Sequence, residues 1–306
     1  MTRVYDLAMT HNLDADEFFI HRVQFHCAAS NMSFFLVEPL WVERFLELFE
    51  RGDLRVKCLL NMHSEHHLPE DVFHRLVKSA ETRGSQVIDP PSVAIAAFDK
   101  ARVHRRLVEA AVPVPHTLIV PRSEVATFQL SEADRAALGT PFVIKPAMGY
   151  GKRGVVLDAT CEADLQRSVA VWKDENYLVQ RRVIPRLLGE DPAYFRVFFV
   201  FGKVWTAWWN CYTDRYRLLT DAERSTYHLE GLEEIVRRIA ALTGMRFFSS
   251  EMAQTESGEF VVIDYVNDQC HTLSQSANPR MGVPDELVAA LAEHLVAGAR
   301  SLIAGQ

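Results

Sequence analysis

The stretch PFVIKPAMGYGKRGVVL, residues 141–157, decides the fold of this chain. Its apolar run at 142–144 predicts a buried strand that ends in Lys145, and the apolar residues 155–157 predict a second strand. The segment suits a polyphosphate ligand, although an ordinary hairpin with a surface lysine is the open alternative. Between the strands lie three glycines, whose backbone can expose N–H groups to an anion, and a basic pair: Gly149, Gly151, Gly154, Lys152 and Arg153.

The loop differs from the two common nucleotide-binding loops. Walker-type and dinucleotide-binding loops run from a strand into a helix, whereas this loop runs from strand to strand. It also lacks the Ser or Thr after the lysine that a Walker-type loop uses for Mg²⁺. Neither of those two folds is expected.

Composition and charge indicate which classes of protein this chain can belong to. The chain has 306 residues, of which 48% are hydrophobic, and this is enough for two or three lobes. The 33 Lys and Arg residues against 40 Asp and Glu residues give a formal charge of -7, so no nucleic-acid partner is expected. No apolar run approaches the roughly 20 residues that span a bilayer, and the first residues lack a signal-peptide core. Five scattered cysteines without a CxxC pair suit reduced thiols. We therefore expect a cytoplasmic protein that does not bind membranes.

Residues 1–95 alternate strand and helix patterns, which predicts a small parallel α/β lobe. The expected elements are strands at 33–39 and 56–61, a helix at 40–50, and a helix that Pro69 opens and that ends near Gly84.

The polar residues of this lobe have two interpretations. Ligands of parallel sheets gather at the carboxyl ends of the strands, so Glu38, Asn61 and His63 are the candidates to face a substrate. Ordinary loop roles are the alternative. His66 and His67 follow His63, but no metal-binding spacing to acids or cysteines is recognisable, and we interpret the three histidines as polar loop residues.

Asp99 is placed to cap a helix that continues to Ala110. Lys100 lies in its first turn, where the helix dipole disfavours a cation, so Lys100 is either solvated or held there to meet an anion. The remaining expected elements are a helix at 162–172, a strand at 177–180, an inter-lobe break at Pro185, a β-rich segment at 194–220 and helices at 229–242 and 285–302.

Two acids mark the last predicted hairpin. Glu251 lies on one strand and Asp264 near the end of the next, with Gly258 at the turn, so antiparallel pairing can bring the two carboxylates close together. Mg²⁺ takes a few carboxylates and completes its shell with phosphate oxygens and water. Exposed acids on a hairpin rim are the alternative. An acid within the apolar run VVIDYV is unusual for a buried strand, which favours the metal site.

Three motifs in this order resemble the ATP-grasp superfamily, in particular its glutathione synthetase-like carboxylate–amine ligases, which include the ribosomal-protein glutamate ligases and D-alanine–D-alanine ligase. The similarity spans residues 99–267 and rests on DKARVHRRLVEAAVPVPHT, FVIKPAMGYGKRGVVL and YLVQRRVI. It implies an α/β and α+β protein in which two α+β lobes clamp ATP after a small parallel α/β domain. The implied domains are residues 1–98, 99–183 with the glycine loop, and 184–306 with the metal site.

The resemblance also implies the roles of individual residues. Contacts with the ATP phosphates are implied for Lys100, Lys145, Gly149, Gly151 and Gly154. Contacts with adenine are implied for Gln180, Arg181, Arg182 and Val183. Catalytic roles near the transferred phosphoryl group and the reacting carboxylate are implied for Lys145, Arg196 and Arg217. Binding of Mg²⁺, or of Mn²⁺ as the alternative ion, is implied for Glu251, Asp264 and Asn267.

The sequence departs from the family pattern at three places. Tyr194 replaces the acid that usually touches ribose, so Glu190 or Asp191 is expected to take over that contact. The family's acid-x-Asn motif is one residue longer here, in the run DYVN, and either Asn267 or Asp268 completes the metal site. Leucines stand where an asparagine usually follows the second arginine. We therefore expect substrates that differ from those of the named ligases.

The resemblance implies an ATP-dependent carboxylate–amine ligase that forms an amide or peptide bond through an acyl phosphate and releases ADP and phosphate. Its substrates would be a small-molecule acid and an amine, such as amino acids or short peptides. Monomer and homodimer both stay open. Two other functions also stay open: a small-molecule kinase on the same fold, and a nucleotide-binding module without catalysis. No Ser-His or Cys-His arrangement is recognisable, in agreement with phosphoryl transfer that requires no side-chain nucleophile.

Overall fold

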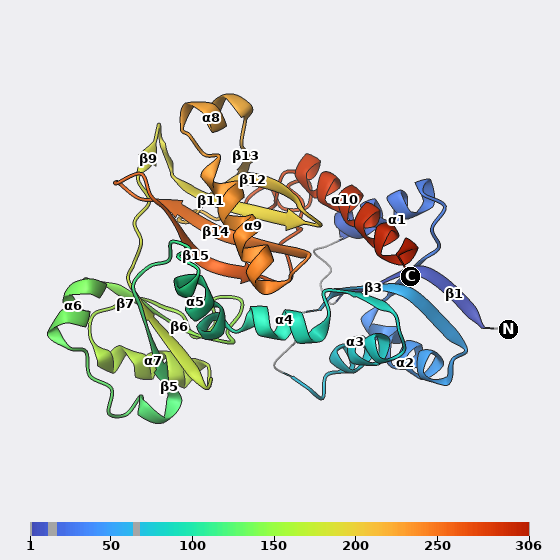
Figure 1. Ribbon diagram of the computed structural model, residues 1–306, viewed down its shortest axis with the longest axis horizontal. Helices are drawn as coiled ribbons and strands as arrows, with labels where there is room; N and C mark the ends of the chain where they lie inside the picture. The colour runs from blue at the N-terminus through green and yellow to red at the C-terminus, as the bar shows by residue number, and fades with distance from the viewer. Residues whose placement is uncertain (1, 12–16, 64–67, 306) are drawn as a thin grey trace. The chain divides into compact units, whose positions relative to one another are not determined.

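The computed structural model describes residues 2–11, 17–63 and 68–305, which are coloured in Figure 1. His66 and His67 lie outside the described residues. The chain forms two compact units. Unit 1 comprises Met1–Ile95, Phe195–Ser249 and Asn267–Gln306, and unit 2 comprises Ala96–Tyr194 and Ser250–Val266. The division into three consecutive domains stays a prediction.

The N-terminal part of unit 1 is a parallel sheet with strand order β2-β1-β3-β4. Ala8 on the central strand β1 pairs with Phe35 on one side and with Leu59 on the other, in the same chain direction. The predicted parallel α/β lobe is confirmed. Its elements are β1 (Arg3–His11), α1 (Glu17–Ala29), β2 (Phe34–Val37), α2 (Val42–Arg51), β3 (Leu54–Met62), α3 (Val72–Thr82) and β4 (Gln86–Ile88).

Helices α2 and α3 bury their apolar faces with this sheet in one core, which includes Phe45, Leu59 and Leu76. The predicted opening of the second helix at Pro69 is wrong. Helix α3 begins at Val72 because the Asp71 side chain accepts hydrogen bonds from two N–H groups of the first turn, and this caps the helix.

The long C-terminal helix α10 (Asp285–Ala304) packs against α1, as Figure 1 also shows. By length and composition alone, α10 is apolar enough to cross a membrane, and 44% of its most apolar window is buried inside the molecule. The sequence therefore does contain one apolar run of spanning length, contrary to expectation. A core helix of a soluble protein meets the same criteria, and the buried face of α10, which includes Leu287, Leu291 and Leu295, is typical of such a helix.

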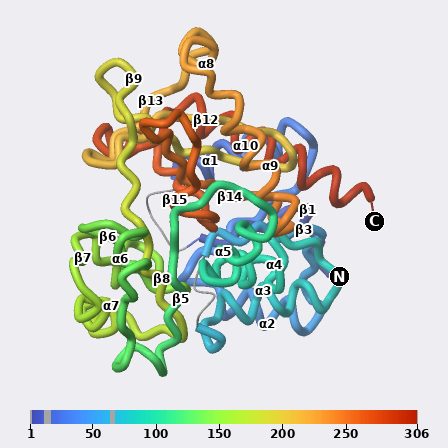
Figure 2. The backbone as a smooth tube through the Cα atoms, turned by 60° about the vertical axis from the view of Figure 1, so that its left-hand side comes forward, coloured from blue at the N-terminus to red at the C-terminus, as the bar shows by residue number. Residues whose placement is uncertain are grey.

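Unit 2 contains an antiparallel sheet with strand order β5-β8-β6-β7, which lies next to helices α6 and α7 in Figure 2. The predicted strand, glycine loop and strand are confirmed as β6, residues 147–155 and β7. The elements are α5 (Lys100–Glu109), β5 (Thr117–Pro121), α6 (Glu132–Leu138), β6 (Phe142–Pro146), β7 (Val156–Ala159), α7 (Leu165–Val171) and β8 (Asn176–Gln180).

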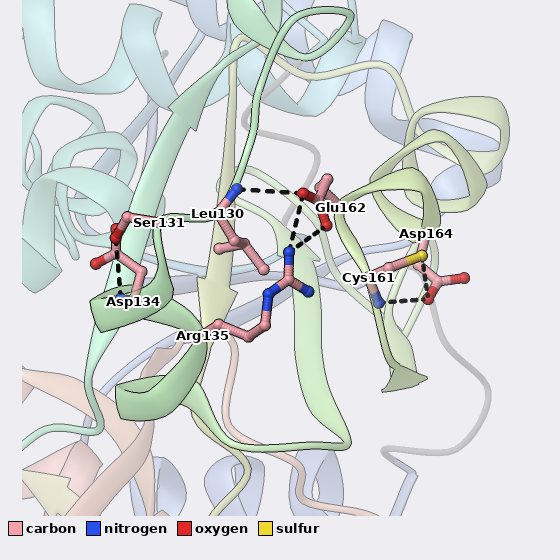
Figure 3. Close-up of polar contacts among 7 residues, drawn as sticks. All are labelled: Leu130, Ser131, Asp134, Arg135, Cys161, Glu162 and Asp164. Atoms are coloured by element: carbon pink, nitrogen blue, oxygen red, sulfur yellow. Dashed lines mark hydrogen bonds and ion pairs between the residues drawn. The ribbon is translucent and has the colours of Figure 1, made fainter.

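Polar contacts link α6 to the segment that precedes α7 (Figure 3). The Arg135 guanidinium of α6 donates to both carboxylate oxygens of Glu162 at 3.2 Å. Glu162 belongs to a short 3-10 helix, residues 162–164, that precedes α7, so the single predicted helix at 162–172 is divided in two. Ser131 caps α6 by accepting from the N–H of Asp134.

A five-stranded sheet has the order β13-β12-β11-β14-β15, and the boundary between the two units cuts through β11, β14 and β15. The predicted strands and helices of this region are confirmed. The elements are β9 (Leu187–Leu188), β10 (Asp191–Pro192), β11 (Tyr194–Val200), β12 (Lys203–Asn210), β13 (Arg215–Leu218), α8 (Asp221–Thr226), α9 (Gly231–Thr243), β14 (Phe247–Gln254) and β15 (Phe260–Asn267), with α4 (Pro91–Phe98) earlier in the chain.

Candidate active site

The base of the glycine loop is held from two sides within unit 2. Lys100 donates from its backbone N–H to Ala147 O at 3.0 Å and from Nζ to Gly149 O at 2.7 Å. On the other side the carboxylate of Asp174 accepts from the N–H of Met148 at 2.6 Å. The Lys100 side chain is therefore not simply solvated in the first turn of α5. Its ammonium group stabilises the glycine loop through the hydrogen bond to Gly149 O.

The glycines of the loop meet two different requirements. Gly151 has φ +58° and open space around it, so it satisfies a left-handed turn. Gly154 has φ +73°, and a Cβ at this position would lie 2.7 Å from Trp172 Cβ. Gly154 thus allows the loop to approach the end of α7, which is a packing role that the sequence did not indicate.

Arg153 at the tip of the loop stacks on aromatic rings. Its guanidinium lies 4.7 Å from the Trp172 ring centre and 5.8 Å from that of Tyr150. The two rings meet edge to face with their centres 5.3 Å apart. This cation–π cluster holds the loop tip against the residue that follows α7.

Lys145 is buried, with 7% of its surface exposed. Its Nζ donates to Ile263 O at 2.8 Å and lies 5.3 Å from the ring centre of Tyr265. Burial lowers the pKa of Lys145, whereas the carboxylates of Asp264 and Glu251 act in the opposite direction and favour the ammonium form. Lys145 is therefore not the surface lysine of an ordinary hairpin, and it shares one charge cluster with the two predicted metal ligands.

Glu251 and Asp264 lie on the neighbouring strands β14 and β15. Asp264 Oδ1 is a buried carboxylate oxygen without a hydrogen-bond partner in the described part of the chain. Glu251 Oε2 accepts from the Tyr194 hydroxyl at 3.2 Å. An unsatisfied buried carboxylate oxygen is costly unless it receives a cation, so this pair fits a divalent ion.

The described residues contain no group of three or more His, Cys, Asp or Glu side chains that could enclose a metal ion. Two carboxylates alone suit Mg²⁺, which keeps waters and phosphate oxygens in its shell, better than they suit an all-protein metal centre. The donor set therefore fits an ion that arrives with a phosphate ligand.

The assignment of Asn267 to the metal site stays a prediction, and one observation weakens it. Successive side chains of a strand alternate between faces, so Asp264 and Asn267, three residues apart on β15, point to opposite faces of a regular strand. Asn267 Nδ2 donates to Ser249 O at 3.3 Å.

The structure does not bring the two predicted catalytic arginines together. The guanidinium of Arg196 lies 5.3 Å from the ring centre of Trp209, and that of Arg217 lies 4.4 Å from the ring centre of Trp208. Adjacent residues on β12 point to opposite faces, and the register agrees, since Arg196 pairs with Ala207 whereas Arg217 pairs with Trp208. The assignment of both arginines to one reaction centre stays a prediction, and their positions on opposite faces of the sheet weaken it.

The two faces differ in their surroundings. Arg217 Nη1 donates to Glu223 Oε1 at 2.7 Å, and Glu223 also closes the capping box of α8. On the face of Arg196, Tyr216 stacks on His271 with ring centres 5.8 Å apart. Burial lowers the pKa of His271, and Arg196 acts in the same direction. His271 was not predicted from the sequence, because a lone histidine after a strand carries no recognisable spacing.

Gln180, the predicted adenine contact, belongs to a buried polar network in unit 2. Its Nε2 donates to Thr117 Oγ1 and to the Tyr265 hydroxyl, both at 3.0 Å. The phenol oxygen lies 2.7 Å from His104 Nδ1. Burial lowers the pKa of His104 to about 4, so the imidazole is neutral at pH 7, and its tautomer sets which of the two groups donates the hydrogen bond. The two bonds from Nε2 orient the side-chain amide of Gln180, and its carbonyl oxygen is left to accept a hydrogen bond from a ligand.

Tyr265 and His104 were also missed, although both carry a signal in the sequence. Tyr265 interrupts the apolar run VVIDYV, and His104 lies on the apolar face of α5 beside Val103 and Leu107.

The other predicted nucleotide contacts stay predictions. The backbone N–H of Arg181 donates to His116 O at 2.8 Å, so it already has a partner. Arg182 is exposed and Val183 is half-buried. Asp191 lies in the short hairpin of β9 and β10, paired with Leu188.

No protein-family profile matches the chain, and no curated protein matches its sequence. Solved structures do match. A RimK domain protein ATP-grasp from Sphaerobacter thermophilus has 17% identity and a TM-score of 0.61 over 97% of this chain and 98% of that one. D-alanine–D-alanine ligase from Bacillus anthracis complexed with ATP has 11% identity and a TM-score of 0.67 over 100% and 99%. The ATP-grasp ligase PsnB complexed with precursor peptide has 15% identity and a TM-score of 0.61 over 98% and 99%. At these identities the likeness shows a shared fold.

Proposed function

This chain has the ATP-grasp fold, and from that premise we propose that it is an ATP-dependent ligase that joins a carboxylate to an amine. The observation that carries the proposal is the charge cluster of Lys145, Glu251 and Asp264 in unit 2. A binding module needs no buried lysine beside two metal-binding acids, whereas phosphoryl transfer needs a cation and a divalent ion at the phosphates.

The proposed reaction uses Mg·ATP, with Mn²⁺ as the alternative ion, to convert the substrate carboxylate into an acyl phosphate, which the amine then attacks to release phosphate. Glu251 and Asp264 would hold the ion. The Lys145 ammonium offsets negative charge on the phosphates and would act from a site that excludes water. The glycine loop, with Lys100 at its base, would cover the phosphates and exclude water, since an acyl phosphate hydrolyses readily.

Only one arginine is retained in this proposal. Arg196 is buried with 7% of its surface exposed and lies on the face that carries His271 and Tyr216, so it is the candidate to stabilise the reacting carboxylate. Arg217 is bound to Glu223 on the other face and is assigned a structural role.

The proposed substrates are a small acid and an amine of the amino-acid or short-peptide class. This choice is supported by neighbours of the same fold, one named as a D-alanine–D-alanine ligase and one complexed with a precursor peptide. A cytoplasmic location remains an expectation from the sequence, and the choice between monomer and homodimer stays open.

The test is ADP release with pools of candidate acids, with and without amines. Amine-dependent ADP release together with an amide product supports the ligase. A stable phosphorylated hydroxyl compound formed without an amine would instead indicate a small-molecule kinase. An absence of ADP with every pool, despite nucleotide binding, would indicate a binding module. Glu251→Gln is the control, because it keeps the shape of the side chain but removes the proposed metal ligand.

A further inference from the structure

Tyr194, the first residue of β11, makes a contact that the fold alone does not explain. Its side chain is 6% exposed, and its hydroxyl donates to Glu251 Oε2 at 3.2 Å within unit 2. The resemblance places a ribose-binding acid at this position, so the phenol replaces a charged acceptor by a neutral donor. Here the side chain contacts a carboxylate of the charge cluster.

We propose that Tyr194 is a positioning residue that orients the Glu251 carboxylate for the divalent ion. The inference rests on the proposed function, because it takes Glu251 as a metal ligand. A hydrogen bond from the phenol occupies Oε2 and restricts rotation of the terminal carboxylate, a torsion that is otherwise broad.

The phenol of Tyr194 is better suited to orient Glu251 than the carboxylic acid that the family usually has at this position. A carboxylate beside Glu251 would repel it and would raise the pKa of one of the two groups. The phenol is neutral at pH 7 and donates a hydrogen bond, so it orients Glu251 without a second negative charge. Groups that hydrogen-bond metal ligands typically change metal affinity by about 10–100-fold when removed.

The contact also explains why no ribose contact is assigned to this position. A hydroxyl that donates to Glu251 is directed toward the charge cluster. Tyr194 is therefore placed with the proposed metal ligand Glu251, and the ribose contact stays an expectation for Glu190 or Asp191.

The experiment compares Tyr194→Phe with Tyr177→Phe in the full-length protein. Both substitutions remove one buried phenol hydroxyl from unit 2, but the Tyr177 hydroxyl donates to Trp172 O and accepts from the backbone N–H of Asp174, so these bonds involve backbone groups and not a carboxylate. The first measurement is the increase in melting temperature caused by Mg²⁺ in the presence of saturating ADP, relative to ADP alone. The second is the Mg²⁺ concentration that gives half-maximal ADP release.

For Tyr194→Phe we expect the Mg²⁺ concentration at the midpoint of both curves to rise about tenfold, with the shift caused by ADP alone unchanged. Tyr177→Phe should lower the melting temperature but leave both Mg²⁺ midpoints unchanged. Unchanged midpoints in Tyr194→Phe would overturn the positioning role.

Glu251→Gln separates this failure from failure of the proposed function. If Glu251→Gln abolishes the Mg²⁺-dependent thermal shift while Tyr194→Phe leaves it intact, the metal site stands and the role of Tyr194 is wrong. If Glu251→Gln keeps the wild-type Mg²⁺ dependence, the metal assignment itself is wrong, and with it both proposals.

Discussion

At the scale of single residues, Lys145 is buried and charged, so the role of its charge can be tested separately from the packing of its side chain. Its Nζ contacts Ile263 O, and the carboxylates of Asp264 and Glu251 stabilise its charge. Lys145→Met keeps a chain of similar length but removes the ammonium, so ADP release should fall at least about 100-fold while the protein stays folded. Nucleotide affinity, measured by titration calorimetry, should fall as well. Lys203→Met, at an exposed strand position, is the control and should behave as wild type. Wild-type turnover in folded Lys145→Met would exclude the phosphate role.

Asp264 tests the metal assignment. Asp264→Asn preserves shape but removes the charge that would hold Mg²⁺, so ADP release should fall far more than nucleotide affinity. Oδ1 has no partner among the described residues, so this loss cannot be attributed to a broken hydrogen bond of that atom. Asp158→Asn serves as the matched control, because Asp158 is an exposed acid on β7 that pairs with Arg167. Superimposable curves of ADP release against Mg²⁺ concentration for wild type and Asp264→Asn would contradict the assignment.

His104 should give a measurable pH dependence of stability. Burial lowers its pKa from 6.5 to about 4. Between these values the unfolded chain binds a proton that the folded chain does not, so the free energy of unfolding falls as the pH drops from 6.5 toward 4. His104→Gln removes this contribution, and its unfolding free energy should depend less steeply on pH in that window.

Urea unfolding at a series of pH values measures this difference. Burial also raises the pKa of Asp89 to about 7, which contributes a slope of opposite sign to both proteins and cancels in the comparison. Equal slopes for wild type and His104→Gln would mean that His104 titrates alike in the folded and unfolded states.

At the scale of elements, the glycine loop joins two strands whose positions are set by the sheet, so its glycines differ in what they tolerate. Gly151→Ala meets only the cost of a left-handed backbone, about 1 kcal/mol. Gly154→Ala adds a steric contact with Trp172 Cβ and with Pro146, and it should cost about 1–3 kcal/mol more. Urea denaturation of the two variants gives the comparison directly. Equal losses of stability would show that the packing of the loop against Trp172 is not limiting.

At the scale of the whole molecule, ligand binding should stabilise the fold and order residues 148–154. Mg·ATP at 100 times its dissociation constant adds about 2.7 kcal/mol to the free energy of unfolding if only the folded state binds it. Hydrogen exchange of the loop should slow in the presence of nucleotide, whereas that of strand β1 in unit 1 should slow only through global stabilisation. Equal exchange in the loop with and without saturating nucleotide would count against its role in binding phosphates.

Much of the fold could be predicted because it depends on local patterns. The alternation of 1–95, the strand, glycine loop and strand around Lys145, and the final hairpin with Glu251 and Asp264 all follow from hydrophobic periodicity and turn residues. The order of three motifs along the chain was enough to indicate the ATP-grasp fold, since that order reports the sequence of elements. The sequence by itself therefore determined which elements form and which residues carry charge near them.

Only the tertiary structure decided which side chains meet. Arg196 and Arg217 have equal claims in the sequence, but the strand register places them on opposite faces of one sheet. The contact of Tyr194 with Glu251, and that of Gln180 with Tyr265, join residues 57 and 85 positions apart. Local periodicity specifies the face of an element but not its neighbour, because the neighbour is chosen by packing between segments distant in the chain. The chemistry proposed for this protein depends on those contacts.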